Sequence, residues 1–169
     1  MPVVADASPL IIFARANHLD LLRDLFGEVW VPERVARKAF RDDPSRPGDA
    51  ELAGIAGAWL FDIASNDVAL VTSLMCEVDA GEATAIALAH ERRLLLLIDD
   101  PAGRRAARAR GVPVIGSAGA EGLARRRGLL ATVRPTLEDL LTHGLRLSRG
   151  LYREILEDAS EGASERMSG

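Results

Sequence analysis

Two neighbouring acids, Asp99 and Asp100, are the residues of this chain best placed for chemistry. They follow Leu94–Ile98, an apolar run that is typical of a buried strand and much shorter than a membrane-spanning helix. A strand with both faces covered is apolar throughout, so we expect this one to be parallel and central. Ligands of open α/β sheets bind beyond the carboxyl ends of the strands, and both acids should therefore face a ligand crevice.

Two further acids stand at the boundaries of other predicted elements. Asp6 closes a short apolar strand over residues 3–6, and Ser8 and Pro9 then give the N-cap and first-turn signals of a helix. Glu82 falls in the first turn of another predicted helix, where the helix dipole favours a carboxylate. Each acid also has a purely structural interpretation, Asp6 as a turn residue and Glu82 as the partner of the dipole.

Strands that alternate with helices form a parallel sheet, whose carboxyl edge would gather these acids. The acids concerned are Asp6, Glu82, Asp99 and Asp100. Carboxylates held close together repel unless they are protonated or bind a cation. Oxygen ligands without histidine or cysteine favour Mg²⁺ or Mn²⁺ over zinc, and such an ion can activate water against a phosphodiester. The sequence contains no P-loop, G-x-G-x-x-G, G-x-S-x-G or H-E-x-x-H motif.

The rest of the pattern supplies the elements that must position these acids. Apolar runs predict strands at residues 3–6, 29–31, 59–63, 94–98 and 112–115. Start signals and helical periodicity predict helices at residues 10–16, 19–26, 33–40, 50–57, 83–93, 101–110, 120–128, 136–142 and 149–158. Since no repeat or second domain is visible, we expect one domain over residues 1–157 and a flexible tail over residues 158–169.

Composition and charge limit the function further. The 169 residues, 48% hydrophobic and 27% charged, are those of an ordinary globular domain with a core of its own. The net charge of −4 argues against a general nucleic-acid coat and leaves room for a local basic patch. Arg104, one turn beyond the paired acids, either contacts phosphate or lies on a solvated helix face. A lone cysteine, Cys76, and the lack of any apolar run near ~20 residues favour a cytoplasmic protein without a membrane partner.

Five segments of the chain carry a family resemblance. They are VVADASPLI at Val3–Ile11, LFGEVWVPERV at Leu25–Val35, DAGEATAIALA at Asp79–Ala89, LLIDDPAGRRAA at Leu96–Ala107 and GVPVIGSAG at Gly111–Gly119. In this order and spacing they resemble the PIN-domain superfamily, the VapC-type toxin nucleases, and within it the branch known as DUF3368. The resemblance implies a three-layer α/β/α fold with a central, mostly parallel sheet. It also implies a Mg²⁺- or Mn²⁺-dependent ribonuclease, often paired with an antitoxin protein and often a homodimer.

The resemblance also assigns site residues. The first acid of the family falls on Asp6, and the Ser or Thr two residues later falls on Ser8. The acid at the start of the later helix falls on Glu82. The strand-end acid falls on Asp100, with Asp99 beside it.

One position departs from the family pattern. The helix after the second strand usually carries a glutamate, and this sequence has Lys38 there. An ammonium in place of a carboxylate changes the local charge by two units, and each unit is worth about 4 kcal/mol over ~4 Å at an effective dielectric of ~20. We therefore expect metal binding to be weaker than is usual in the family.

Three functional interpretations follow. The first is an RNA-cleaving PIN-like enzyme in which Asp6, Glu82 and Asp100 hold the metal, with Asp99 as a further catalytic acid. In it, Ser8 positions Asp6 or a phosphate and Arg104 contacts the RNA backbone. The second is a catalytically degenerate module that binds RNA or a protein partner, favoured by Lys38. The third, a response-regulator-like receiver, fails on order, because receivers carry their acid pair near the first strand.

Overall fold

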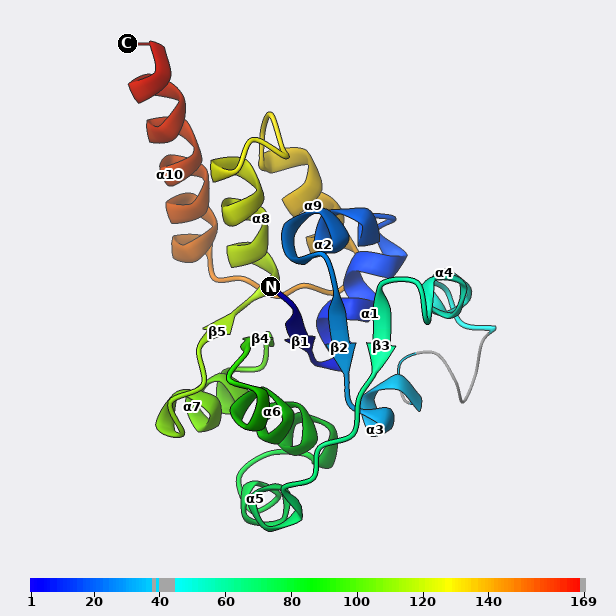
Figure 1. Ribbon diagram of the computed structural model, residues 1–169. Helices are drawn as coiled ribbons and strands as arrows, with labels where there is room; N and C mark the ends of the chain where they lie inside the picture. Colours follow the sequence, from blue (N-terminus) through cyan, green and yellow to red (C-terminus); the bar gives the residue numbers. More distant parts are fainter. Residues whose placement is uncertain (38, 40–44, 168–169) are drawn as a thin grey trace.

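A parallel five-stranded sheet forms the centre of the computed structural model, which describes residues 1–37, 39 and 45–167 (Figure 1). The strands run in the order β3-β2-β1-β4-β5, and every pairing is parallel. Their bounds are β1 Val3–Ala5, β2 Val29–Val31, β3 Leu60–Asp62, β4 Leu95–Leu97 and β5 Val114–Ile115. The apolar run predicted to be central forms β4, an interior strand; the middle of the sheet is β1.

Helices cover both faces of this sheet and are numbered in chain order. Their bounds are α1 Ala7–Arg15, α2 Leu19–Phe26, α3 Glu33–Ala36, α4 Asp49–Ile55, α5 Val68–Leu74, α6 Ala80–Arg92, α7 Pro101–Ala109, α8 Ser117–Arg126, α9 Arg134–Thr142 and α10 Arg149–Met167. One apolar core joins the sheet to α1, α2, α8 and α9, and a second joins it to α5, α6 and α7 (Figure 1). These three layers confirm the predicted α/β/α class. None of the helices in the described residues is long and apolar enough to span a membrane.

Small side chains explain how α6 comes close to the strands. Its alanines at positions 83, 85, 87 and 89 are all fully buried, so little side-chain bulk separates α6 from the elements packed around it, which include β1, β4 and α5. Helix α7 also lies close, since a Cβ on Gly103 would sit 2.5 Å from Cδ1 of the fully buried Ile98. The first turns of α6 and α7 are therefore held near the carboxyl ends of β1 and β4.

Several predicted boundaries differ from those observed, and three of the differences change an interpretation made from the sequence. Helix α1 begins at Ala7 with Asp6 in the N-cap position, so Ser8 is not the cap but an exposed residue of the first turn. Helix α8 begins at Ser117, three residues earlier than predicted, and the Ser117 amide donates to Asp99 Oδ1. Helix α10 continues to Met167, so it runs through most of the residues predicted to form a tail.

A buried acid, Glu121 of α8, lies away from the sheet edge. It is fully buried, and among the described residues neither of its carboxylate oxygens has a hydrogen-bond partner of normal geometry. The nearby Thr136 hydroxyl donates instead to the Val133 carbonyl at 3.0 Å. Burial raises the pKa of Glu121, an effect that Thr136 and His18 reduce and Asp139 increases. The neutral, protonated acid is therefore the form that this core favours.

Candidate functional site

Asp6 lies at the carboxyl edge of the sheet, directly after β1. Its backbone amide donates to the Leu97 carbonyl at 3.0 Å, which places Asp6 beside the end of β4. The side chain is only 6% exposed, although it belongs to a charged residue. A buried carboxylate at a strand end is costly unless nearby groups or an ion compensate its charge.

Glu82 is fixed by the start of α6. The Glu82 amide donates to Asp79 Oδ1 at 2.8 Å, and the Asp79 amide donates to Glu82 Oε2 at 3.1 Å. This reciprocal pair is a capping box, for which the spacing of Asp79 and Glu82 is the sequence signal. Sequence analysis placed Glu82 correctly in the first turn but did not assign Asp79 to the site.

Asp100 occupies the N-cap of α7. Its Oδ2 accepts from the Gly103 amide at 2.9 Å, and Pro101 follows in the first helical turn. The lack of a side chain at Gly103 matters here, because a Cβ at that position would lie 3.6 Å from the Glu82 carboxyl carbon. The carboxylate of Glu82 thus lies against the same turn that Asp100 caps.

Electrostatics link these acids to one another. The pKa of Glu82 rises to about 7, first because of burial and then because Asp79, Asp100 and Asp6 are close enough to repel its charge. The hydrogen bond from the Asp79 amide acts in the opposite direction. A Cβ on Gly81 would also lie 4.0 Å from Asp6 Oδ1 and 3.2 Å from Asp79 Oδ1. The structure therefore brings together four acids from three segments, which we call the acid cluster: Asp6, Asp79, Glu82 and Asp100.

Asp99 does not join the acid cluster, although it is the neighbour of Asp100. Its Oδ1 accepts from the Ser117 amide at 2.7 Å, and its Oδ2 accepts from the Ser117 hydroxyl at 2.6 Å. Ser117 is fully buried at the start of α8. With both oxygens hydrogen-bonded to Ser117, Asp99 ties the end of β4 to α8, and its role as a catalytic acid stays a prediction.

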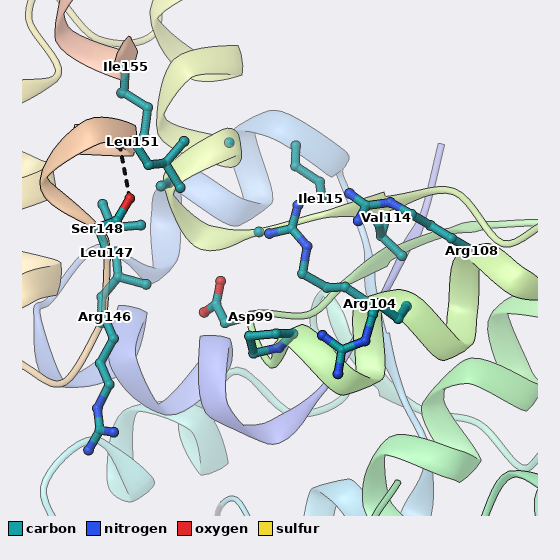
Figure 2. Close-up of a pocket in the computed structure, with 16 residues that line it drawn as sticks. Asp99, Arg104, Arg108, Val114, Ile115, Arg146, Leu147, Ser148, Leu151 and Ile155 are labelled. Carbon is teal, nitrogen blue, oxygen red and sulfur yellow. Dashed lines mark hydrogen bonds between the residues drawn. The ribbon is translucent and has the colours of Figure 1, made fainter. Parts of the chain in front are cut away.

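The other predicted site residues lie apart from the acid cluster or outside the described residues. Arg104 projects from α7 into a cavity that Asp99 also lines, and its guanidinium lies against Gly116 (Figure 2). Ser8 is exposed in the first turn of α1, which puts its hydroxyl at the surface beside Asp6. Lys38 lies outside the described residues, so its effect on the acid cluster stays a prediction.

The acid cluster offers oxygen donors of the kind that Mg²⁺ and Mn²⁺ prefer. Glu82 and Asp100 each use one carboxylate oxygen to cap a helix, which leaves the other oxygen for an ion. Within residues 1–37, 39 and 45–167, however, no three His, Cys, Asp or Glu side chains are already arranged around a common metal position. The donor types fit a divalent ion, and small side-chain rotations would have to complete its coordination.

A comparison with protein families gives one finding that covers nearly the whole chain. The profile of DUF3368, described as a PIN domain, matches residues 2–161. A comparison with curated proteins gives no match. The matched range includes the whole sheet and every member of the acid cluster.

Proposed function

Because this chain belongs to the DUF3368 family of PIN domains, we propose that it is a Mg²⁺- or Mn²⁺-dependent endoribonuclease. The match confirms the family resemblance predicted from the five sequence motifs. A PIN domain is a nuclease-type fold, and the parallel sheet with helices on both faces agrees with it. Metal dependence and the choice of RNA as substrate are our proposals.

The observation that carries this proposal is the acid cluster. Asp6, Glu82 and Asp100 come from three segments far apart in the sequence, yet the charges of Asp6 and Asp100 both act on Glu82. Stability alone does not favour such an arrangement, since like carboxylates in a partly buried site repel. A divalent cation between the carboxylates would replace their mutual repulsion by attraction to the ion. A metal-dependent reaction is therefore the best explanation of the cluster.

Each acid has a role in the proposed reaction. Asp6 and Asp100 would hold the ion, and Glu82 would hold it or orient the attacking water. A bound divalent ion supplies Lewis-acid activation of the phosphodiester. The capping bonds of Glu82 to Asp79 and of Asp100 to Gly103 hold one oxygen of each carboxylate at the start of its helix, and the other oxygen would turn toward the ion.

We extend the proposal to the partners that the family resemblance implies. The enzyme would be the toxin of a toxin–antitoxin pair and would form a homodimer. Light scattering at two protein concentrations tests the dimer. A neighbouring reading frame that encodes a small protein able to bind this chain and suppress its cleavage would support the toxin role.

A second candidate is a degenerate PIN-like module that binds RNA or protein without cleaving. Two observations favour it: the sequence has Lys38 where the family usually carries a glutamate, and no set of three ligands is preassembled in the described part of the chain. Calorimetry with Mn²⁺ on wild type and Lys38→Glu measures this effect. Equal affinities would show that Lys38 does not weaken the site.

Cleavage of a panel of structured and single-stranded RNAs, with Mn²⁺ or with EDTA, separates the two candidates. We expect the wild type to cleave only with metal and Asp6→Asn to lose cleavage while keeping the wild-type circular dichroism spectrum. Asp20→Asn, at a side chain 77% exposed on α2, is the matched control and should cleave normally. Cleavage by Asp6→Asn at the wild-type rate would end the nuclease assignment to this site.

A further inference from the structure

A cavity of about 590 Å³ is lined by Asp99, the neighbour in sequence of Asp100 of the acid cluster. Figure 2 shows Arg104 and Arg108 of α7 on one wall and Leu147, Leu151 and Ile155 on the facing wall, with Asp99 between them. We call it the arginine cavity, because four arginines and a single carboxylate line it: Arg104, Arg105, Arg108, Arg146 and Asp99. Its volume is in the range of sites that hold one small ligand or a short segment of a chain.

The arginines of this cavity differ from Arg110, which follows them in sequence. Arg110 forms an ion pair with Glu77 at 2.5 Å. Within the part of the chain that the structure describes, neither Arg104 nor Arg108 forms an ion pair or a side-chain hydrogen bond, and both line the cavity. Two like charges four residues apart on one helix destabilise it. An anion in the cavity would remove that repulsion.

Asp99 supplies only one negative charge against the four arginines that line the cavity. Both of its carboxylate oxygens accept hydrogen bonds from Ser117, which holds the group at the base of α8. The protein as a whole carries a net charge of −4, so the positive charge here is a local feature. A local basic site on an acidic protein attracts anions over several ångströms and directs them to that one place on the surface.

The two walls together indicate the class of anion. Guanidinium groups on α7 suit phosphates, since they donate in a planar fork. The facing wall carries the apolar side chains of Leu147, Leu151 and Ile155 beside Arg146, and Leu151 is 40% exposed. Single-stranded nucleic acid combines the two matching features, a charged backbone and flat bases that lie against nonpolar side chains.

We propose that the arginine cavity binds the single-stranded RNA segment next to the phosphate that is cleaved; this inference rests on the proposed function. Asp99 lines the cavity and Asp100 belongs to the acid cluster, and their Cα atoms are separated by one peptide unit, about 3.8 Å. An RNA strand that places a phosphate at the acid cluster therefore has its neighbouring nucleotides at the cavity. Arg104 and Arg108 contact the backbone, and Leu147 and Leu151 contact a base or ribose.

Binding without cleavage tests this proposal independently of the nuclease reaction. The probe is a fluorescein-labelled single-stranded RNA of about ten nucleotides, titrated in EDTA and followed by fluorescence anisotropy at several salt concentrations. We expect Arg104→Gln/Arg108→Gln to weaken binding about tenfold and to lower the salt slope by about 1.4, or ~0.7 per phosphate contact. Arg146→Gln, on the facing segment, should weaken binding about threefold.

Arg153→Gln is the matched control, because Arg153 is an exposed arginine of α10 that does not line the cavity. Equal losses in the control and the double variant, or wild-type binding by the double variant, would overturn the proposal. Competition by polyglutamate as strong as that by RNA would also overturn it in favour of an acidic protein partner. Melting curves of every variant establish that the losses do not come from unfolding.

Steady-state cleavage separates a failure of this inference from a failure of the proposed function. If wild-type protein binds RNA through the arginines but never cleaves it with Mn²⁺, the nuclease proposal fails and the binding site stands. If wild-type protein cleaves RNA and the double variant has an unchanged KM, the cavity is not a substrate site. The expected result is a KM raised about tenfold with kcat within twofold of wild type, since these arginines contact substrate away from the reacting phosphate.

Discussion

The acid cluster and the arginine cavity lie on either side of one peptide bond, yet they are built in opposite ways. On the Asp100 side, carboxylates from three segments crowd together and raise the pKa of Glu82 to about 7. On the Asp99 side, the carboxylate is fully hydrogen-bonded to Ser117 and the nearby charges are arginines. One region is an anionic site that favours a cation, and the other is a cationic site that favours an anion.

This contrast shows how two adjacent and chemically identical residues acquire different roles. The backbone turns after β4, so that Asp100 becomes the N-cap of α7 while Asp99 reaches the N-terminus of α8. A metal-bound phosphodiester needs both kinds of region, one for the ion and one for the flanking backbone. Substitutions in each region test whether the acid cluster and the arginine cavity act independently, as their separate contacts indicate.

The largest expected difference is between Asp100→Asn and Asp99→Asn. Asparagine can still cap a helix, so neither change should unfold the protein. Asp100→Asn removes a proposed metal ligand and should lower kcat/KM about 100-fold, whereas Asp99→Asn should lower it less than about tenfold. Cleavage kinetics in Mn²⁺ give both values. Equal losses would make Asp99 a catalytic acid of the same weight as Asp100, as the sequence first predicted.

A smaller effect is expected on stabilisation by metal. An Mn²⁺ concentration ten times Kd should stabilise the wild type by about 1.4 kcal/mol, or roughly 4 °C in Tm. Glu82→Gln should lose this shift, although glutamine can keep the capping box with Asp79. Glu121→Gln is the matched control, since Glu121 is also a buried acid with a raised pKa but lies far from the sheet edge. Loss of the Mn²⁺-induced rise in Tm in both variants would mean that this rise depends on overall stability and not on metal binding at the acid cluster.

The pH dependence of stability without metal should be smaller again. Glu82 has a folded pKa near 7 against an ordinary value of 4.5, so its ionised form disfavours folding. The penalty is complete above pH 7 and disappears as pH falls from 7 to 4.5. After allowance for solvent screening of this partly exposed group, Glu82→Gln should raise the unfolding free energy by about 1 kcal/mol at pH 8 and leave it unchanged at pH 4. Urea unfolding at both pH values measures it, and an equal gain at pH 4 would contradict the electrostatic origin.

The smallest effect is predicted for Arg110→Gln. Arg110 lies just beyond α7 and pairs with Glu77, away from the residues that line the arginine cavity. Its removal should change RNA affinity and cleavage less than twofold. Anisotropy and cleavage assays run beside Arg104→Gln provide the measurement. A loss equal to that of Arg104→Gln would show that net positive charge, and not position, governs RNA binding.

Local sequence signals were enough to place most elements and three of the acids. Asp6, Glu82 and Asp100 each follow a strand or open a helix, and parallel topology then brings such positions to one edge. Helix α5 was missed because its apolar residues do not mark one buried face; Val68 is 71% exposed, and Leu74 is its only buried residue.

Neither the orientation of the Asp99 side chain nor the existence of the arginine cavity could be predicted from the sequence. The contact of Asp99 is with Ser117, eighteen residues later, and no local pattern distinguishes it from Asp100. The cavity exists because the chain around Leu147 and Leu151 returns to face α7, a tertiary contact without a local signature. Pairings between distant segments depend on packing, which a single sequence does not reveal.

The close approach at Gly103 has a consequence for both regions at once. A methyl group there would clash with the buried Ile98 and press against the Glu82 carboxyl group. Helix α7 carries the Asp100 cap at its start and Arg104 and Arg108 along its length. An outward displacement of α7 would therefore misalign the acid cluster and the arginine cavity together. The missing side chain at Gly103 thereby sets the spacing between α7, which carries residues of both regions, and the end of β4.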